Sequence, residues 1–247
     1  MNIVLLGHQD IASLYALNRL MHLRPEHRYT AFTSGVHAST NKVPGSLREL
    51  AKVDAELCAK YLSNSQVGEV LRVAPELAAP NSSKGLTALR RCDPDLIVSI
   101  RYRRILRDDA IGVPRHGVLN LHSGILPQYR GVMATFWAML NDEMEIGTTL
   151  HRIVDSGIDT GPVIGISRPA TNRGQSYLGN VLGLYRDGCS MLARAIGDLE
   201  RGKPLAESRQ TAGPGQYFST PDEAAIQVFE AKSLKIMTGK ELEAILE

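Results

Sequence analysis

The sequence contains few of the features that mark specialised classes of protein. Only three cysteines occur in 247 residues, Cys58, Cys92 and Cys189, and no two share the spacing of a metal site or a redox motif. We therefore expect reduced thiols and no bound metal. The formal net charge is only +2, which argues against nucleic acid or a membrane surface as the main partner.

Long apolar runs are missing as well. The apolar stretch 1–7 covers only a few residues and has no basic residue before it, so we expect neither a signal peptide nor a membrane span there. Hydrophobic residues make up 43% of the chain and charged residues 22%, as in ordinary globular proteins. These features predict a cytoplasmic protein.

Strand and helix patterns alternate along the first half of the chain. Apolar runs typical of buried strands cover residues 2–6, 96–100 and 117–121, and residues 29–33 and 67–73 are further strand candidates. Helical patterns cover residues 10–23, 46–62, 84–91 and 108–111. Ser46 and Glu49 have the spacing of a capping box at the start of the second helix. The alternation predicts an α/β fold with a mostly parallel, twisted sheet flanked by helices.

The second half continues the pattern and then changes. We expect helices at residues 132–140 and 176–200 and strands at 146–154 and 163–167, after which the chain is rich in proline and glycine up to a helix at 222–231. We predict a main domain over residues 1–200 and a small C-terminal extension over 201–247. The segment Gln216–Pro221 has two adjacent aromatic residues and predicts a strand that packs on the main sheet or on a second subunit. A homodimer is therefore a hypothesis.

Polar side chains gather where the strand at residues 117–121 ends. Ligands bind at the carboxyl ends of strands in parallel sheets. Asn120 and His122 are two residues apart, so both face the same side of the strand. An Asn amide binds a developing oxyanion, and a His accepts a proton from an attacking amine. This pair indicates acyl transfer.

A second polar segment, His151–Pro162, contains Asp155 and Asp159 in a glycine-rich turn. A carboxylate beside His122 would stabilise the protonated imidazole. Asp-Ser-Gly and Asp-Thr-Gly are ordinary turn sequences on their own. An aspartic-protease site is disfavoured, because such a site needs a second equivalent Asp and an all-β setting. The two segments together indicate an acyl-transfer site far more specifically than either segment alone.

The segments Asn120–Gly131 and His151–Pro162 resemble the two signatures of the folate-dependent formyltransferases. That family includes glycinamide ribonucleotide transformylase, methionyl-tRNA formyltransferase and the sugar N-formyltransferases. The resemblance covers roughly residues 1–200 and implies a Rossmann-like formyltransferase fold, with 10-formyltetrahydrofolate as the formyl donor. It also implies that Asn120, His122 and Asp159 are the catalytic residues, whereas Asp155 shapes the loop.

The resemblance further implies where the two substrates bind. The residues implied for the folate donor are Arg103, Arg104, Ile105, Leu106, Ile125, Leu126, Pro127, Val154, Asp155, Gly157 and Ile158. We expect the acceptor side to be lined by Arg101 and by the turn His8, Gln9 and Asp10.

Departures from the family pattern narrow the acceptor. Many members have Pro where this chain has Ser123, and the turn 7–10 lacks the Gly/Ser-rich loop expected for a ribonucleotide phosphate. The tail is too short and not basic enough for the tRNA enzymes. A small-molecule amine remains, first a nucleotide-linked amino sugar and second an N-hydroxyornithine-type siderophore precursor.

Three other functions compete with formyl transfer. A formyltetrahydrofolate hydrolase would keep the same three residues and use water instead of an amine. A non-catalytic folate-binding protein has no need of all three catalytic groups. A nucleotide-dependent oxidoreductase is disfavoured, because the glycine fingerprint is missing after the first strand.

Overall fold

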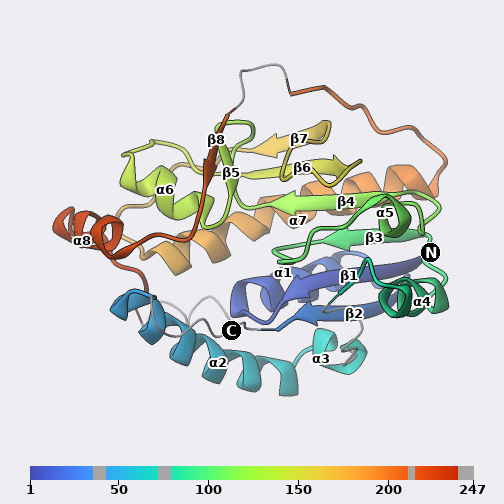
Figure 1. Cartoon of the computed structure of the whole chain (residues 1–247), viewed down its shortest axis with the longest axis horizontal. Coiled ribbons are helices and arrows are strands. Elements are labelled where there is room, and N and C mark those ends of the chain that lie inside the picture. Colours follow the sequence, from blue (N-terminus) through green and yellow to red (C-terminus); the bar gives the residue numbers. More distant parts are fainter. Residues whose placement is uncertain (36–42, 72–78, 211–214, 239–247) are drawn as a thin grey trace.

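The centre of the computed structural model is a six-stranded sheet (Figure 1). The structure describes residues 1–35, 43–71, 79–210 and 215–238. The strand order is β2-β1-β3-β4-β6-β7; the first four strands are parallel, and β6 and β7 are antiparallel to their neighbours. This confirms the predicted α/β fold with a mostly parallel sheet. The strands are β1 Asn2–His8, β2 Arg28–Ser34, β3 Leu96–Ser99, β4 Val118–His122, β6 Thr148–Ile153 and β7 Val163–Ser167.

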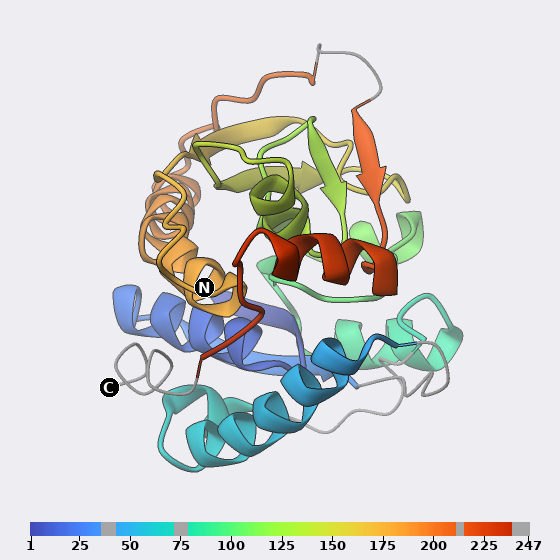
Figure 2. The ribbon, with the colours of Figure 1, turned by 90° about the vertical axis from the view of Figure 1, so that its left-hand side faces the viewer.

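Helices cover both faces of the sheet (Figure 2). One face is packed by α1 (Ile11–Leu23) and α7 (Tyr177–Glu200), and the other by α4 (Ser83–Arg91) and α5 (Asp108–Ile111). The alternation of side chains along β1 supplies both layers: Leu5 belongs to the larger core with α1 and α7, and Leu6 belongs to the smaller one. The remaining helices are α2 Gly45–Ser63, α3 Gln66–Val70, α6 Ala134–Leu140 and α8 Glu223–Ala231.

Two of the predicted local features are wrong. The capping box is not formed, because α2 begins already at Gly45 and the hydroxyl of Ser46 donates to the carboxylate of Glu230, 2.6 Å away. The strand predicted at residues 67–73 is helical up to Val70, where the short helix α3 packs against α1. Its apolar residues fit a buried helix as well as a strand, and a run this short does not distinguish the two. Residues 72 and 73 lie outside the described residues.

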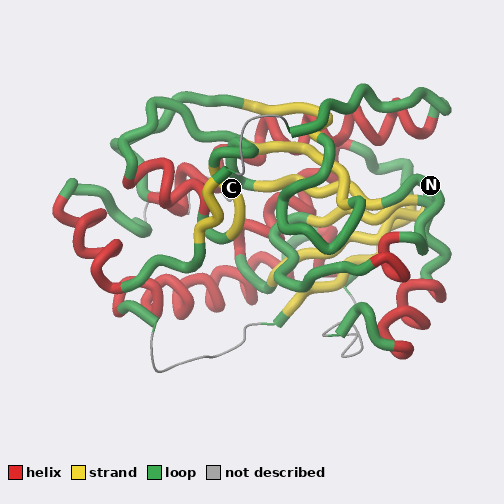
Figure 3. Tube along the Cα trace, turned by 45° about the horizontal axis from the view of Figure 1, so that its top comes forward, coloured by secondary structure: helices red, strands yellow, loops and turns green. Residues whose placement is uncertain are grey.

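The C-terminal segment forms a second, small sheet. β8 (Gln216–Phe218) pairs in parallel with β5 (Tyr129–Gly131), and Figure 3 separates this pair from the central sheet. The predicted strand therefore exists, but its partner inside the chain is β5 and not the main sheet. Farther along, the ring of Phe229 in α8 stacks on Phe136 in α6, with ring centroids 4.4 Å apart. The division of the chain at residue 200 stays a prediction.

In the described part of the chain, none of the helices has both the length and the apolar character needed to cross a membrane.

Candidate active site

The expected catalytic residues meet at one cavity beside the carboxyl end of β4. Asn120 and His122 lie on β4 itself, and Asp159 lies in the turn between β6 and β7. All three line a cavity of about 360 Å³. The alternation along β4 places the amide and the imidazole on the same side, as the sequence predicted.

Asp159 lies between two histidines. One carboxylate oxygen is 3.6 Å from His122 Nδ1, and the other is 3.5 Å from His151 Nε2. The backbone N–H of Gly131 donates to the first oxygen at 2.9 Å. Burial alone would raise the pKa of Asp159, but the charge of His122, the contact with His151 and the Gly131 N–H outweigh it and lower the pKa to about 2. The carboxylate is therefore ionised at neutral pH.

The hydrogen-bond partners assign the protons on the two rings. His122 Nε2 lies 2.7 Å from the carbonyl oxygen of Tyr129, which only accepts, so Nε2 carries a proton. His151 Nδ1 likewise donates to the carbonyl oxygen of Arg152 at 2.9 Å. His151 Nε2 lies 2.9 Å from the amide nitrogen of Asn120, which donates to it when the ring is neutral. The amide of Asn120 is held by this bond and keeps a second N–H for a ligand.

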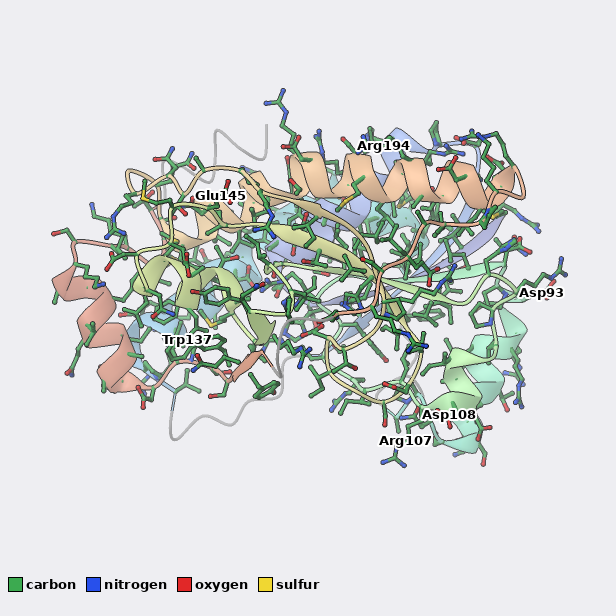
Figure 4. The ribbon with its side chains drawn as sticks, turned by 90° about the horizontal axis from the view of Figure 1, so that it is seen from above. Asp93, Arg107, Asp108, Trp137, Glu145 and Arg194 are labelled. Atoms are coloured by element: carbon green, nitrogen blue, oxygen red, sulfur yellow. The ribbon has the colours of Figure 1, made fainter. Side chains whose placement is uncertain are left out.

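The residues expected to bind the folate donor fall into three groups. Seven line the cavity: Arg103, Arg104, Ile105, Leu106, Asp155, Gly157 and Ile158. The segment 125–127 is buried instead, and the backbone N–H of Leu126 donates to the Thr149 hydroxyl at 3.1 Å. Val154 is half exposed beside the cavity-lining Asp155. Directly after the segment 103–106, Arg107 and Asp108 project outward at the start of α5 (Figure 4).

Exposed apolar side chains gather at this cavity. Seven large hydrophobic side chains are exposed among the described residues, and three of them line the cavity: Ile105 (50% exposed), Ile158 (41%) and Tyr217 (55%). Val154 (50%) directly precedes Asp155, which also lines the cavity. Apolar surface left in water around a polar centre is typical of a ligand-binding site. A flat, partly apolar ligand fits this rim.

Of the four residues expected on the acceptor side, only Arg101 lines the cavity. Its guanidinium binds both carboxylate oxygens of Asp10, at distances from 2.8 to 3.0 Å. His8 is buried, with Nδ1 3.0 Å from the Ser34 hydroxyl, and Gln9 is exposed. The polar groups of Asp10 and His8 are thus bonded within the protein.

Several cavity residues were not identified from the sequence. His151 opens the second signature and lies opposite Asn120 in the β4–β6 pairing, so its position in that segment was the available signal. Gly131 is the last residue of the first signature, and Val132 and Met133 follow it directly. Tyr217 comes from the C-terminal extension, and no sequence spacing connects it to the rest.

One group of potential metal ligands was found among the described residues, and it lies elsewhere. Glu26, His27 and Glu200 come close together. The guanidinium of Arg24 lies 2.7 Å from Glu26 and 2.6 Å from Glu200, so this group is already neutralised by a cation. It is an ion-pair cluster outside the residues that line the cavity.

Comparisons with known proteins agree with this fold. The family model described as "Formyl transferase" matches residues 36–172, more than half of the chain. A methionyl-tRNA formyltransferase from Thermodesulfovibrio yellowstonii is 34% identical over 108 residues, which is 41% of this chain and only 35% of that protein. The matched part therefore spans about a third of that relative.

Solved structures share the fold at low sequence identity. A 4-N formyltransferase from Francisella tularensis superposes with a TM-score of 0.60 at 17% identity, over 99% of this chain and 85% of that chain. An N-formyltransferase from Helicobacter canadensis, solved with folinic acid and dTDP-3-aminofucose, gives 0.55 at 19% identity, over 89% and 71%. With the family match over residues 36–172, the chain belongs to the formyl transferase family.

Proposed function

We propose that this protein is an N-formyltransferase that moves a formyl group from 10-formyltetrahydrofolate to the amine of a small molecule. The observation that carries the proposal is the convergence of Asn120, His122 and Asp159 at one cavity with an apolar rim. Membership of the formyl transferase family supports the chemistry.

The proposed transfer takes place in two steps. The acceptor nitrogen attacks the formyl carbon on N10 of the folate, and the carbonyl electrons move to oxygen. The free N–H of Asn120 donates to that oxyanion. As the tetrahedral intermediate collapses, the bond from carbon to N10 breaks, and N10 takes up the proton that the amine has lost.

His122 is the proposed carrier of that proton. Its Nε2 is occupied by the Tyr129 carbonyl, so Nδ1 is the nitrogen that takes the proton from the amine and returns it to N10. The carboxylate of Asp159, 3.6 Å from Nδ1, stabilises the positive charge on the ring during the transfer.

A nucleotide-linked amino sugar is the proposed acceptor. The N-formyltransferase from Helicobacter canadensis, which shares the fold, was solved with such a compound and with folinic acid. In our chain, Asp10 neutralises Arg101 and the turn at residues 7–10 offers no glycine-rich phosphate loop. An acceptor phosphate at that turn is therefore disfavoured.

A donor–acceptor panel tests the proposal. Purified protein is incubated with 10-formyltetrahydrofolate and either nucleotide-linked amino sugars or N-hydroxylated ornithine, and the formylated products are identified by mass spectrometry. We expect formylated amino sugar and an equal amount of tetrahydrofolate. Formate released without any amine would indicate a hydrolase instead, and an unchanged donor with every acceptor would refute the proposal.

A further inference from the structure

The side chain of Tyr217 forms one wall of the candidate active site, although it comes from the C-terminal extension. It is 55% exposed and lines the same cavity as Asn120, His122 and Asp159. No hydrogen bond joins its hydroxyl to any other residue in the described ranges of the chain. An aromatic ring with a free hydroxyl in a polar cavity is available to a ligand.

The pairing of β8 with β5 determines where this ring points. Phe218 faces the core and stacks between Tyr129 and Trp137, with centroid distances of 5.2 Å to each. The indole N–H of Trp137 also donates to the carbonyl oxygen of Ser219 at 2.9 Å, and Figure 4 shows Trp137 beside this segment. Because side chains alternate along a strand, Tyr217 faces the other way, into the cavity.

Gly131 brings the ring close to the catalytic carboxylate. A Cβ atom at this position would lie 2.2 Å from the carbonyl oxygen of Phe218 and 2.8 Å from the Tyr217 ring. Its φ of 95° also favours glycine. The N–H of the same residue donates to Asp159. The ring of Tyr217 therefore lies beside Gly131, whose N–H binds the expected catalytic residue Asp159.

The position of the ring assigns it to the acceptor. The ring approaches Gly131, which belongs to neither of the cavity-lining segments expected to bind the donor, residues 103–106 and 155–158. A transfer between two substrates needs a second surface that reaches Asn120 and His122, and the wall formed by residues 131–133 and Tyr217 is available for it. This step rests on the proposed function.

We propose that Tyr217 is a specificity-determining residue that binds the ring of the acceptor amino sugar. The apolar face of the sugar ring packs on the phenol ring, and a sugar hydroxyl bonds to the phenol hydroxyl. A linear hydroxylated amino acid lacks the flat face that this contact needs, so the residue favours cyclic acceptors.

Three variants test this assignment. Tyr217→Ser removes the ring, Tyr217→Phe keeps the ring without the hydroxyl, and Val228→Ser is the control. Val228 is 51% exposed in the same extension and does not line the cavity. Calorimetric titration measures the Kd of 5-formyltetrahydrofolate, and steady-state assays with three nucleotide-linked amino sugars, dTDP-3-aminofucose among them, measure KM and kcat. Thermal unfolding verifies that each variant is folded.

We expect Tyr217→Ser to raise the acceptor KM about tenfold or more, the scale of a lost aromatic contact. The folate Kd should change less than about twofold, the Phe variant should fall between wild type and Ser, and Val228→Ser should match wild type. A raised folate Kd with an unchanged acceptor KM would assign the ring to the donor and overturn the inference. Wild-type protein that binds folate but none of the three sugars would also overturn it and leave the donor half of the proposed function intact.

Discussion

Two buried carboxylates lie near the same edge of the sheet and have opposite surroundings. Asp10 binds the guanidinium of Arg101 through both oxygens and accepts the backbone N–H of Ser13, 2.8 Å away. Asp159 faces two imidazoles and one backbone N–H. Each cluster includes a non-glycine residue in the left-handed region, Arg101 with a φ of 60° and Asp159 with a φ of 54°. Both clusters therefore hold a backbone conformation that costs free energy.

The difference between the two clusters lies in their cations. A guanidinium keeps its proton at every accessible pH, so the pair of Asp10 and Arg101 is a fixed structural element. An imidazole can both accept and donate a proton, so the surroundings of Asp159 can take part in proton transfer. Asp159 lines the cavity and Asp10 does not. We therefore propose a chemical role for Asp159 and a structural role for Asp10.

The largest expected effect is on the rate. Asn120→Ala removes the donor to the oxyanion, and kcat for formyl transfer should fall about 100- to 1000-fold. His122→Ala should lower kcat by a similar factor, because this variant has no side-chain nitrogen in place of Nδ1 to carry the proton. Circular dichroism should show both proteins folded, and Asn64→Ala at the exposed end of α2 is the control. Near-normal turnover in either cavity variant would refute the assignment.

The second prediction concerns stability. Asp10→Ala leaves the buried Arg101 without its partner, and the free energy of unfolding should fall by about 3 to 5 kcal/mol in urea titrations. The double variant Asp10→Ala/Arg101→Ala should recover part of this loss, because no unpaired charge remains. Asp159→Asn should lower kcat strongly and the free energy of unfolding less, the reverse of Asp10→Ala. A loss below about 1 kcal/mol for Asp10→Ala would contradict the structural role.

The third prediction separates the two regions by pH. Burial, together with the charge of Arg103, lowers the pKa of His8 from 6.5 to about 4. The unfolded chain then binds the proton first, so stability falls as the pH decreases from about 6.5 to 4, by about 3 kcal/mol. The pKa of Asp159 is lowered from 3.8 to about 2, so its contribution of about 2 kcal/mol is lost only below pH 3.8.

Urea titrations between pH 7 and pH 2 measure both windows. His8→Gln should flatten the profile between pH 6.5 and 4 and leave the lower window unchanged. Asp159→Asn should do the reverse. If both variants flatten the same window, the two regions do not titrate independently, and the comparison fails.

The sequence predicted most of the central fold because its strands are apolar and its helices carry apolar residues at helical spacing. The helices predicted at residues 176–200 and 222–231 are formed, and the side chains of Ser176 and Asp222 cap α7 and α8. The strand predicted at residues 67–73 was wrong because four apolar side chains in seven residues fit either a strand or a turn of buried helix. Periodicity alone therefore predicts long elements better than short ones.

Spacing alone predicted the candidate site only where its residues are close in sequence, whereas Asp159 and the segment 103–106 were implied by the family resemblance. Asn120 and His122 share one strand, so their spacing was sufficient. Tyr217 and Gln210 reach the same site from the extension, and their contacts depend on a chain path that no local pattern encodes. The pair of Asp10 and Arg101 likewise joins residues 91 positions apart. Long-range polar contacts need the structure.

The smallest expected effect concerns a brace behind Asp159. The amide of Gln210 donates to the carbonyl oxygens of Asp159 and Gly161 at 2.9 and 2.8 Å, and its oxygen accepts from Arg130 at 3.1 Å. Gln210→Ala removes these bonds, each worth about 1 kcal/mol. The turn then holds the carboxylate less firmly against His122, so kcat should fall about threefold to tenfold while the folate Kd stays constant.

The same assay separates this brace from a general loss of stability. Gln210→Glu keeps the size of the side chain but donates neither bond, so its kcat should fall like that of the Ala variant. Gln216→Ala, an exposed position on the same segment, should match wild type. A full kcat for Gln210→Glu would show that the Asp159 turn does not need these two donors. The contrast with Asp10 would then be sharper, because the position of Asp159 would depend on its histidines and the Gly131 N–H alone.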